Sequence, residues 1–448
     1  MKTNISPSRI CAYKILYDVL ENKAFSNISV NKHLNSSLKL SSDRALCVNI
    51  VYGTLKNRNR LLKIIGRISK TPVEKLDKKE EIILLMSIYQ LFYLKKVPDY
   101  AIINDAVSMA KFYVGSSVTG FTNAVLRNVQ RQKDELLNER EDDFFELMYY
   151  EYGYEKWLTK LLCGDYSKEA LLEYAKACEM TPSLTVRVNT LKTDDETALN
   201  ELEKDGIAAE KTYVPHVLKI KGAENVFAKS SFKNGLFFAQ DISGAISGFV
   251  LGEGSKEEIL DLCAAPGAKS FGAAMLNPEA QITSCDISAN KLELLKQSAR
   301  QLGFKNIRTM RSDSTEENPA FINRFEKVIC DVPCSGLGVV RRKPEILYNA
   351  TQPHIKNLRT VQTKCLENAV KYTKHDGTLL YSTCTINKDE NERVVEDVLR
   401  NNKKLKLSPI ILPFELLSSH PEAKDGMLCL NPQKDDSDGF FIAKLIKK

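Results

Sequence analysis

The sequence predicts a multi-domain protein: an all-α helical bundle, then a small α+β unit, then a doubly wound α/β domain. Three observations predict this class. At 448 residues the chain is too long for one hydrophobic core. Its first third carries apolar residues at helical spacing, and its last half alternates strand-like with helix-like segments. We expect domains at residues 1–138, 139–230 and 231–448.

Residues 1–138 are expected to be all-helical. The stretch SSDRALCVNIVYGTLKNRNRLLKIIGRI begins at a Ser-Ser-Asp cap, and Leu46, Ile50, Val51 and Leu55 recur at helical spacing. KKEEIILLMSIYQLFYL is apolar nearly all round after a charged first turn, which predicts a central buried helix. NDAVSMAKFYV and GFTNAVLRNVQRQKDELL follow after short connections, so the region reads as a helix bundle.

Residues 139–230 combine a helical linker with a small α+β domain. SLTVRVNTL is a β-branched alternating run, DDETALNELEKDG is a capped helix that ends on Gly206, and VPHVLKI is strand-like. Arg187 and Asn189 alternate outward from the first of these strands. We expect both to be polar side chains on the exposed face of the strand, and the alternative is that they contact a ligand.

From residue 231 to residue 448 strands and helices alternate. The strand-like runs are EEILDLCA, AQITSCDI, NIRTMRSD, FEKVICDV and GTLLYSTC, and the helices include KSFGAAML, SANKLELLKQSARQLG and a long one near 355–373. This alternation predicts a mostly parallel sheet with ligands beyond the carboxyl ends of its strands. The last stretch, GMLCLNPQKDDSDGFFIAKLIKK, is expected to form a hairpin on the sheet edge.

Composition restricts the compartment and the partners. No apolar run approaches the roughly 20 residues of a membrane span, and the start shows no signal peptide, so we expect a cytoplasmic protein. The 11 cysteines form no C-x-x-C pair and the 5 histidines show no zinc-ligand spacing, so we expect reduced thiols and no metal. Residues 1–133 carry a net charge of +13 on a chain of +7. This indicates an arm that holds a polyanion, with a solvated lysine-rich surface as the alternative.

The stretch ILDLCAAPGAKS is the first strand–turn–helix of the predicted sheet. Its alanines and its glycine let a ligand approach the backbone and the start of the helix, its proline fixes the turn, and its lysine can meet a carboxylate. The G-x-G-x-x-G of dinucleotide-binding proteins is missing, which disfavours NAD. The residues expected to line a cofactor here are Cys263, Ala264, Ala265, Pro266, Gly267, Ala268 and Lys269.

Two acids end the next two strands. Asp286 can accept hydrogen bonds from both hydroxyls of a ribose, and Asp313 could face the amino group of an adenine. For Asp313 taken alone, capping of a helix is the alternative. A nucleoside with a carboxylate and no phosphate is the ligand that fits this set, and S-adenosylmethionine has that composition.

Two further strands run out to a cysteine. In VICDVPCSGLGVVRRKPE the strand ends in a rigid turn, so Asp331 and Cys334 are expected at the mouth of a pocket, and TLLYSTCTIN ends similarly on Cys384.

Three motifs, DLCAAPGAKS, DVPCSGLG and YSTCTINKDENERVVE, together resemble the signature motifs of the RNA cytosine-C5 methyltransferases. AFSNISVNKHL, DRALCVNIVYGTLKNR and FTNAVLRN resemble the antitermination factor NusB. The resemblance covers nearly the whole chain. It implies a NusB-like RNA-binding bundle and a Rossmann-like class I S-adenosylmethionine-dependent methyltransferase domain. Four residues depart from the family motifs without removing a functional group that the chemistry needs: Ala268, Ser270, Val332 and Leu337.

Methylation of cytosine C5 requires a thiolate that adds to C6, a group that protonates or hydrogen-bonds N3, and a base for release. This chemistry alone leaves open which cysteine attacks. The resemblance implies Cys384 as the nucleophile, Cys334 as the helper in product release, and Asp331 as a contact to the cytosine and to the cofactor. The alternative is the arrangement of the DNA cytosine methyltransferases, in which the Pro-Cys thiol, here Cys334, attacks.

The resemblance further implies 16S ribosomal RNA, not in the fully assembled ribosome, as the substrate of a monomeric enzyme. The target base must leave any stack to reach a thiol. The alternatives are a different rRNA or tRNA site, a non-catalytic NusB-like RNA-binding protein, and a nucleotide-dependent oxidoreductase. The basic residues expected to contact RNA are Arg341, Arg342 and Lys343, after the catalytic loop, and Arg58 and Arg60, in the bundle.

Overall fold

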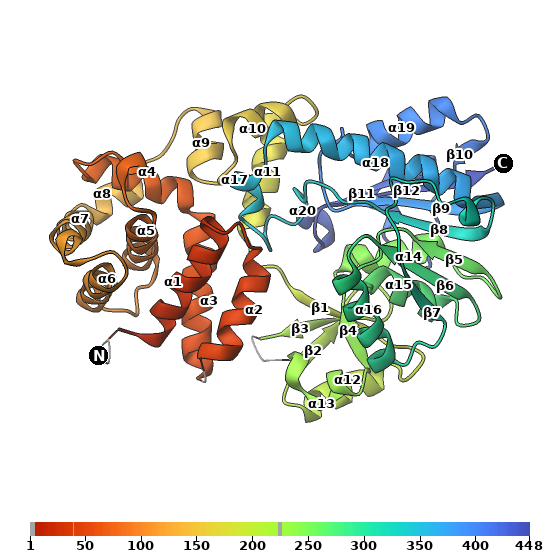
Figure 1. Ribbon diagram of the computed structural model, residues 1–448, viewed down its shortest axis with the longest axis horizontal. Coiled ribbons are helices and arrows are strands. Elements are labelled where there is room, and N and C mark those ends of the chain that lie inside the picture. Colours follow the sequence, from red (N-terminus) through yellow and green to blue (C-terminus); the bar gives the residue numbers. More distant parts are fainter. Residues whose placement is uncertain (1–4, 39, 223–225) are drawn as a thin grey trace. The chain divides into compact units, whose positions relative to one another are not determined.

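The computed structural model describes residues 5–38, 40–222 and 226–448 (Figure 1). These residues form two compact units. The first contains the chain up to residue 180 together with residues 340–350, and the second contains residues 181–339 and 351–448. The chain therefore leaves the second unit shortly after the Pro-Cys motif and returns to it eleven residues later.

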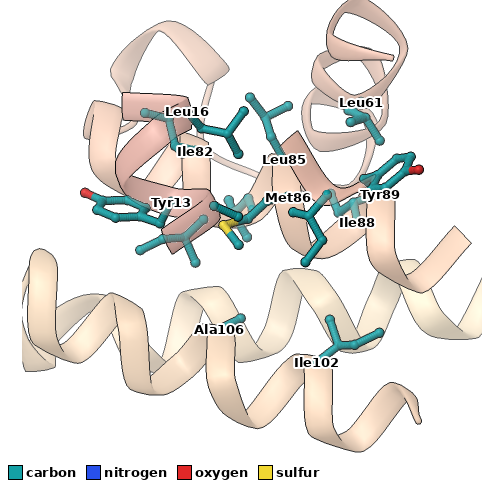
Figure 2. Packing of buried hydrophobic residues seen from close by; sticks show 14 of the residues in the cluster. Tyr13, Leu16, Leu61, Ile82, Leu85, Met86, Ile88, Tyr89, Ile102 and Ala106 are labelled. Atoms are coloured by element: carbon teal, nitrogen blue, oxygen red, sulfur yellow. The ribbon is translucent and has the colours of Figure 1, made fainter. Parts of the chain in front are cut away.

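Helices build the first unit, as predicted. Its central helix, α5 (Lys78–Tyr93), begins where the Asp77 carboxylate accepts a hydrogen bond from the N–H of Lys79, and it is buried on nearly all sides. Figure 2 shows the packing of side chains from α1, α4, α5 and α6. The other helices are α1 (Pro7–Leu20), α2 (Ser26–Ser37), α3 (Ser41–Lys56), α4 (Arg58–Ile68), α6 (Asp99–Tyr113), α7 (Thr119–Arg131), α8 (Lys133–Asn138), α9 (Phe144–Tyr150), α10 (Lys156–Leu162), α11 (Lys168–Glu179) and α17 (Ile346–Asn349), with 3₁₀ turns at Val73–Lys75 and Ser116–Val118.

The segment from residue 41 to residue 68 forms two helices, α3 and α4. They are separated at Asn57, whose side-chain Nδ2 donates a hydrogen bond to the carbonyl of Gly53 at 2.8 Å. An asparagine that bonds to its own preceding turn competes with the helical backbone. The predicted Ser-Ser-Asp cap is wrong, because α3 begins at Ser41 after Leu40 and no side chain caps it.

Residues 340–350 are anchored within the helical unit. The backbone N–H of Ser26 donates a hydrogen bond of 2.8 Å to Oε1 of Glu345, which is buried. The ammonium of Lys343 lies 4.9 Å from the ring centroid of Phe25. These contacts hold the segment against the start of α2.

The second unit opens with a four-stranded antiparallel sheet in the order β2-β3-β1-β4. Asp194 caps helix α12, because its carboxylate accepts a hydrogen bond from the N–H of Thr197. The predicted α+β character is confirmed. The elements are β1 (Leu184–Val188), α12 (Asp195–Lys204), β2 (Ala208–Lys211), β3 (Val217–Lys221), a 3₁₀ turn (Val226–Ala228), α13 (Ser230–Lys233) and β4 (Phe237–Ala239).

Arg187 and Asn189 were expected to be exposed, and this is wrong, because both are 0% exposed. Arg187 donates to the carbonyl of Ala245 at 3.1 Å, and its guanidinium lies 4.9 Å from the ring centroid of Phe249. Both partners belong to helix α14 (Ile242–Leu251). The helix covers the strand face that alternation had left open to solvent, and burial lowers the pKa of Arg187 to about 10.

The larger sheet has the strand order β10-β12-β9-β8-β5-β6-β7, with β11 paired to β12. The five strands from β9 to β7 are parallel, and β10, β11 and β12 are antiparallel to their neighbours. The strands are β5 (Glu258–Asp261), β6 (Gln281–Asp286), β7 (Ile307–Arg311), β8 (Phe325–Asp331), β9 (Thr373–Thr383), β10 (Leu405–Leu407), β11 (Met427–Leu430) and β12 (Phe440–Lys447).

Helices cover both faces of this sheet (Figure 1). In β8, Ile329 packs in the core under α14, α15 and α16, while its neighbours Val328 and Cys330 pack in the core under α18 and α19. This two-sided burial explains why consecutive residues of β8, from Val328 to Cys330, are all apolar. The remaining elements are α15 (Ala268–Leu276), α16 (Ala289–Leu302), α18 (Gln352–Tyr372), α19 (Glu392–Asn401) and α20 (Pro432–Asp435), with 3₁₀ turns at Pro319–Phe321, Leu417–Ser419 and Pro421–Asp425.

The predicted C-terminal hairpin is present as β11 and β12, but β12 is not an edge strand. It lies between β9 and β10, and the short β10 takes the outer position. Three residues carry too little alternation to be predicted as a strand. The strand order reverses between β5 and β8, which is where an open α/β sheet binds its ligands.

Candidate active site

The two predicted cysteines lie side by side at the carboxyl ends of β8 and β9. Because these strands are parallel neighbours, with Asp331 opposite Ser382, the residues that follow them meet at one edge. The Sγ atoms of Cys334 and Cys384 are 3.1 Å apart, and the backbone N–H of Cys384 donates to Sγ of Cys334 at 3.3 Å. The backbone N–H of Gly338 also donates a hydrogen bond of 2.9 Å to the carbonyl of Cys384, which joins the loop after β8 to the loop after β9.

Asp331 lies at the end of β8 between two donors. Its Oδ2 accepts a hydrogen bond from Nζ of Lys269 at 2.6 Å, and its Oδ1 accepts one from Oγ of Ser382 at 2.7 Å. We expected Lys269 to meet a carboxylate of a ligand, and the carboxylate that it contacts in this structure is that of Asp331. The two hydrogen bonds fix the orientation of the Asp331 carboxylate at the end of β8.

The charges around the two thiols differ. Burial alone would lower the pKa of Lys269, but the negative charges of Asp331, Cys384 and Asp261 raise it overall. The pKa of Cys334 is raised well above its usual range by its hydrogen bond with Cys384, by burial, and by the negative charges of Cys384 and Glu390. Cys384 therefore interacts with the positive charge of Lys269, and Cys334 interacts with the negative charge of Glu390.

The AAPG turn joins β5 to α15, and Gly267 is the residue that its backbone demands. Its φ is +116°, and a Cβ there would lie 2.6 Å from Cζ of Phe271 and 2.8 Å from Cγ of Leu295. The N–H of Ala264 donates to the carbonyl of Cys285 at 2.8 Å, which holds the turn against β6. Ala265, Pro266 and Ala268 complete the turn.

Asp286 and Asp313, at the ends of two strands, can each accept further hydrogen bonds. Oδ1 of Asp286 accepts from the N–H of Ser288 at 2.8 Å, and no donor of the described residues reaches its Oδ2. Oδ1 of Asp313 accepts from both the N–H and the hydroxyl of Thr315, which lowers the pKa of Asp313. The Cys263 thiol points to Oγ of Ser314 at 3.5 Å. All of these residues lie in the second unit, at the same end of the sheet as the cysteines.

The basic residues expected to contact RNA have several different environments in the first unit. Arg60 pairs with Glu151 at 2.8 Å and donates to two backbone carbonyls, and Arg341 is only 5% exposed. The Arg58 guanidinium lies 5.1 Å from the ring centroid of Tyr348. These three side chains therefore support the packing of the helical unit. Arg342 and Lys343 remain partly exposed.

Sequence reasoning missed three polar residues that support the site. Asp261 lies under the AAPG turn, where Ser270 Oγ donates to its Oδ2 at 2.7 Å, and burial raises the pKa of this carboxyl to about 7. Ser382 orients Asp331, and Glu390 lies behind both cysteine loops. Each stands in a motif quoted above, but a polar residue in a buried strand or loop becomes informative only when its partner is known.

Groups of three or more His, Cys, Asp and Glu side chains that could hold a metal ion are absent from the described part of the chain. Among its described helices, none combines the length and the apolar character of a membrane span.

Three family models match successive parts of the chain. The NusB family matches residues 6–131, the ferredoxin-like domain of RsmF/B-like methyltransferases matches residues 154–227, and the 16S rRNA methyltransferase RsmB/F family matches residues 249–446. Two solved structures show the same fold. One, described as PH0851, is 24% identical with a TM-score of 0.83 over 100% of both chains. The other, NSun6 from Pyrococcus horikoshii with SFG, is 22% identical with a TM-score of 0.59 over 66% of this chain and 99% of that one.

Similar curated proteins extend over almost the whole sequence. The "Probable ribosomal RNA small subunit methyltransferase B" of Bacillus subtilis (strain 168) is 31% identical and covers 98% of each chain. The "Ribosomal RNA small subunit methyltransferase B" of Escherichia coli O7:K1 is 28% identical over 91% of each chain. The chain therefore belongs to the family of ribosomal RNA small subunit methyltransferases of the RsmB/F type.

Proposed function

We propose that the protein transfers a methyl group from S-adenosylmethionine to C5 of one cytosine in 16S ribosomal RNA, through a covalent bond between Cys384 and C6. The observation that carries this proposal is the thiol pair. Two cysteines 3.1 Å apart, beside an aspartate and a lysine, supply the nucleophile and the release group that this reaction needs.

The residues at the end of the sheet fit the cofactor. Gly267 lets the turn pack closely on Phe271 and Leu295, and the small residues before it leave room for a ligand beside the N-terminus of α15. Asp286 has an oxygen available to ribose hydroxyls, and Asp313 lies at the end of the next strand. When bound, S-adenosylmethionine supplies the methyl group as an electrophilic carbon on a sulfonium.

The Asp286→Ala substitution is expected to weaken cofactor binding by about 2 to 4 kcal/mol, because it removes a charge-assisted pair of hydrogen bonds to the ribose. Titration calorimetry with S-adenosylmethionine measures this change. The matched control is Asp313→Ala. The Asp313 carboxylate already accepts hydrogen bonds from Thr315, which lower its pKa, so its loss should have a smaller effect on cofactor binding. Unchanged affinity in Asp286→Ala would place the ribose elsewhere.

The attack begins with Cys384 as a thiolate. Its Sγ bonds to C6 of the cytosine, the C5–C6 double bond opens, and the proton of Cys334 moves to N3 of the ring. Asp331 then accepts a hydrogen bond from the N3–H or the amino group of the ring, because a carboxylate can accept further donors beyond Lys269 and Ser382. These residues make C5 nucleophilic enough to take the methyl group.

Release uses the second thiol. Once Sγ of Cys384 is bonded to carbon, its charge no longer raises the pKa of Cys334, and Cys334 can exist as a thiolate. That thiolate removes the proton from C5, the electron pair re-forms the C5–C6 bond, and the C6–sulfur bond breaks toward Cys384. The proton on N3 leaves to solvent, so the pair returns to one thiol and one thiolate.

The RNA side of the proposal rests on the helical unit. Its family model and the net charge of +13 over residues 1–133 support an RNA-holding role, with Arg342 and Lys343 as partly exposed cations next to the catalytic loop. We propose rRNA outside the fully assembled ribosome as the substrate of a monomer. The 11 free cysteines support a reducing compartment, the cytoplasm.

Bisulfite sequencing of ribosomal RNA from a strain that lacks this gene tests the function. One cytosine in 16S rRNA should be protected from deamination in the parent strain and converted in the deletion strain. Plasmid-borne wild-type protein should restore the protection. Loss of a signal in large-subunit rRNA or tRNA instead would identify a different target, and no change in any RNA would contradict cytosine-C5 methylation.

A further inference from the structure

Glu390 lies behind the two cysteine loops and is fully buried. Both of its carboxylate oxygens accept hydrogen bonds from Ser335, the residue after Cys334. The backbone N–H donates to Oε2 at 2.8 Å, and the hydroxyl donates to Oε1 at 2.6 Å. The carboxylate thus holds the Pro-Cys loop immediately beyond its thiol.

Two amide side chains complete this network. Nε2 of Gln362, in α18, donates at 3.0 Å both to Oε2 of Glu390 and to the carbonyl of Pro333. Nδ2 of Asn387 donates to Oε1 of Glu390 at 3.0 Å. Because Pro333 precedes Cys334, the loop is fixed on both sides of the thiol.

The same carboxylate residue is tied to the Thr-Cys loop. The hydroxyl of Ser335 lies 2.8 Å from Oγ1 of Thr385, which follows Cys384. The carbonyl of Glu390 accepts a hydrogen bond of 2.6 Å from the hydroxyl of Tyr381, in the strand that leads to Cys384. Glu390 therefore connects the two loops that carry the sulfurs.

The charge of Glu390 is not neutralised by a nearby cation. The donors to its carboxylate are neutral groups, and in the described part of the chain no Lys, Arg or His nitrogen lies within 4.0 Å of it. Its negative charge is one of the causes that raise the pKa of Cys334, after the hydrogen bond with Cys384 and burial. The ammonium of Lys269, by contrast, interacts with Cys384.

We propose that Glu390 is a positioning residue that sets the two thiols in register and keeps the proton of the pair on Cys334. This rests on the proposed function, in which the sulfurs have different roles. With the negative carboxylate on the Cys334 side, the pair loses its proton from Cys384, and the attacking thiolate forms there. Glu390 would thus decide which of two adjacent cysteines attacks, without contacting the RNA or the cofactor.

The first test measures the charge effect in the full-length protein without RNA. Alkylation of Cys334 by iodoacetamide is followed against pH in a Cys384→Ala background, with Glu390 either intact or changed to Gln. The Glu390→Gln change should move the midpoint of alkylation down by about 0.5 to 1 pH unit, since a negative neighbour raises a thiol pKa. Asp389→Asn, an acid one residue away that pairs with Arg393, is the control and should not move it.

The second test measures the consequence for the reaction. With both cysteines present, Glu390→Gln should lower turnover about 10- to 100-fold, as expected for a misplaced reacting group. The affinity for S-adenosylmethionine should stay unchanged, because Glu390 is not among the residues at the cofactor turn. Asp389→Asn should keep wild-type turnover.

An unmoved alkylation midpoint in folded Glu390→Gln protein would overturn the proposal, even if turnover fell. If that variant does not fold, Ser335→Ala serves instead. It removes one donor from the carboxylate, so the midpoint should move up, and a midpoint that stays or falls contradicts the proposal. Because the alkylation readout uses no RNA, a correct shift without any RNA methylation by the wild-type protein would count against the proposed function and not against Glu390.

Discussion

Replacing Cys384 with alanine should abolish methyl transfer to ribosomal RNA, with a loss on the order of 10⁴-fold or more in turnover. The substitution removes the atom that is proposed to bond to C6, and nothing else in the site carries out that step. The cofactor affinity should be unchanged, because the turn at Gly267 and the acid Asp286 are untouched. Single-turnover methylation with radiolabelled cofactor and calorimetry measure the two quantities.

The control for this experiment is Cys429→Ala. Cys429 is another partly exposed thiol of the second unit, in β11, and its pKa is raised mainly by burial. Its removal should leave turnover within a factor of about two. Measurable turnover by Cys384→Ala would transfer the attack to Cys334, as in the DNA enzymes, and would reverse the assignment of the two sulfurs.

The Cys334→Ala protein should accumulate a covalent complex with its RNA. Cys384 remains able to attack, because solvent can supply the N3 proton in place of Cys334. The sulfur that takes the C5 proton is gone, however, and we expect release to slow by about 10²-fold or more. The complex would appear as a retarded band on a denaturing gel.

The double substitution Cys334→Ala/Cys384→Ala is the control for the trapped complex, because it lacks the sulfur that forms the bond and should give no band. Folding and RNA binding of the single variant can be verified by melting and by filter binding. A folded Cys334→Ala protein that binds RNA and forms no covalent complex would remove Cys334 from the release step.

Most of the fold could be predicted because each element is determined by its own side chains. Helix α5 is apolar on all sides after a charged first turn, and the strands β5, β6 and β8 are short, mostly buried segments that alternate with helices along the chain. The errors occur where the burial or the secondary structure of a residue depends on an element distant in the sequence. Arg187 was expected in solvent because alternation cannot show that α14 covers it, and β10 is a strand only because β12 lies beside it.

The same distinction applies to the site. The positions of Cys334 and Cys384 at two strand ends follow from the pattern of each strand, and their separation of 3.1 Å follows from β8 and β9 being adjacent. The supporting groups depend on contacts between distant residues. Glu390 reaches Ser335 across 55 residues, and Asp331 reaches Lys269 across 62. No local pattern contains these pairs.

The hydrogen bond between Ser26 and Glu345 has a consequence during translation. Its two partners are 319 residues apart, and both belong to the helical unit. At a synthesis rate of about 5 to 20 residues per second, the ribosome needs roughly 15 to 65 s to make the chain between them. Throughout this interval the nascent helical bundle lacks residues 340–350, of which Tyr348 packs against its core. The first unit of the protein is therefore completed only after most of the second has been synthesised, so the order of folding departs from the order of the chain.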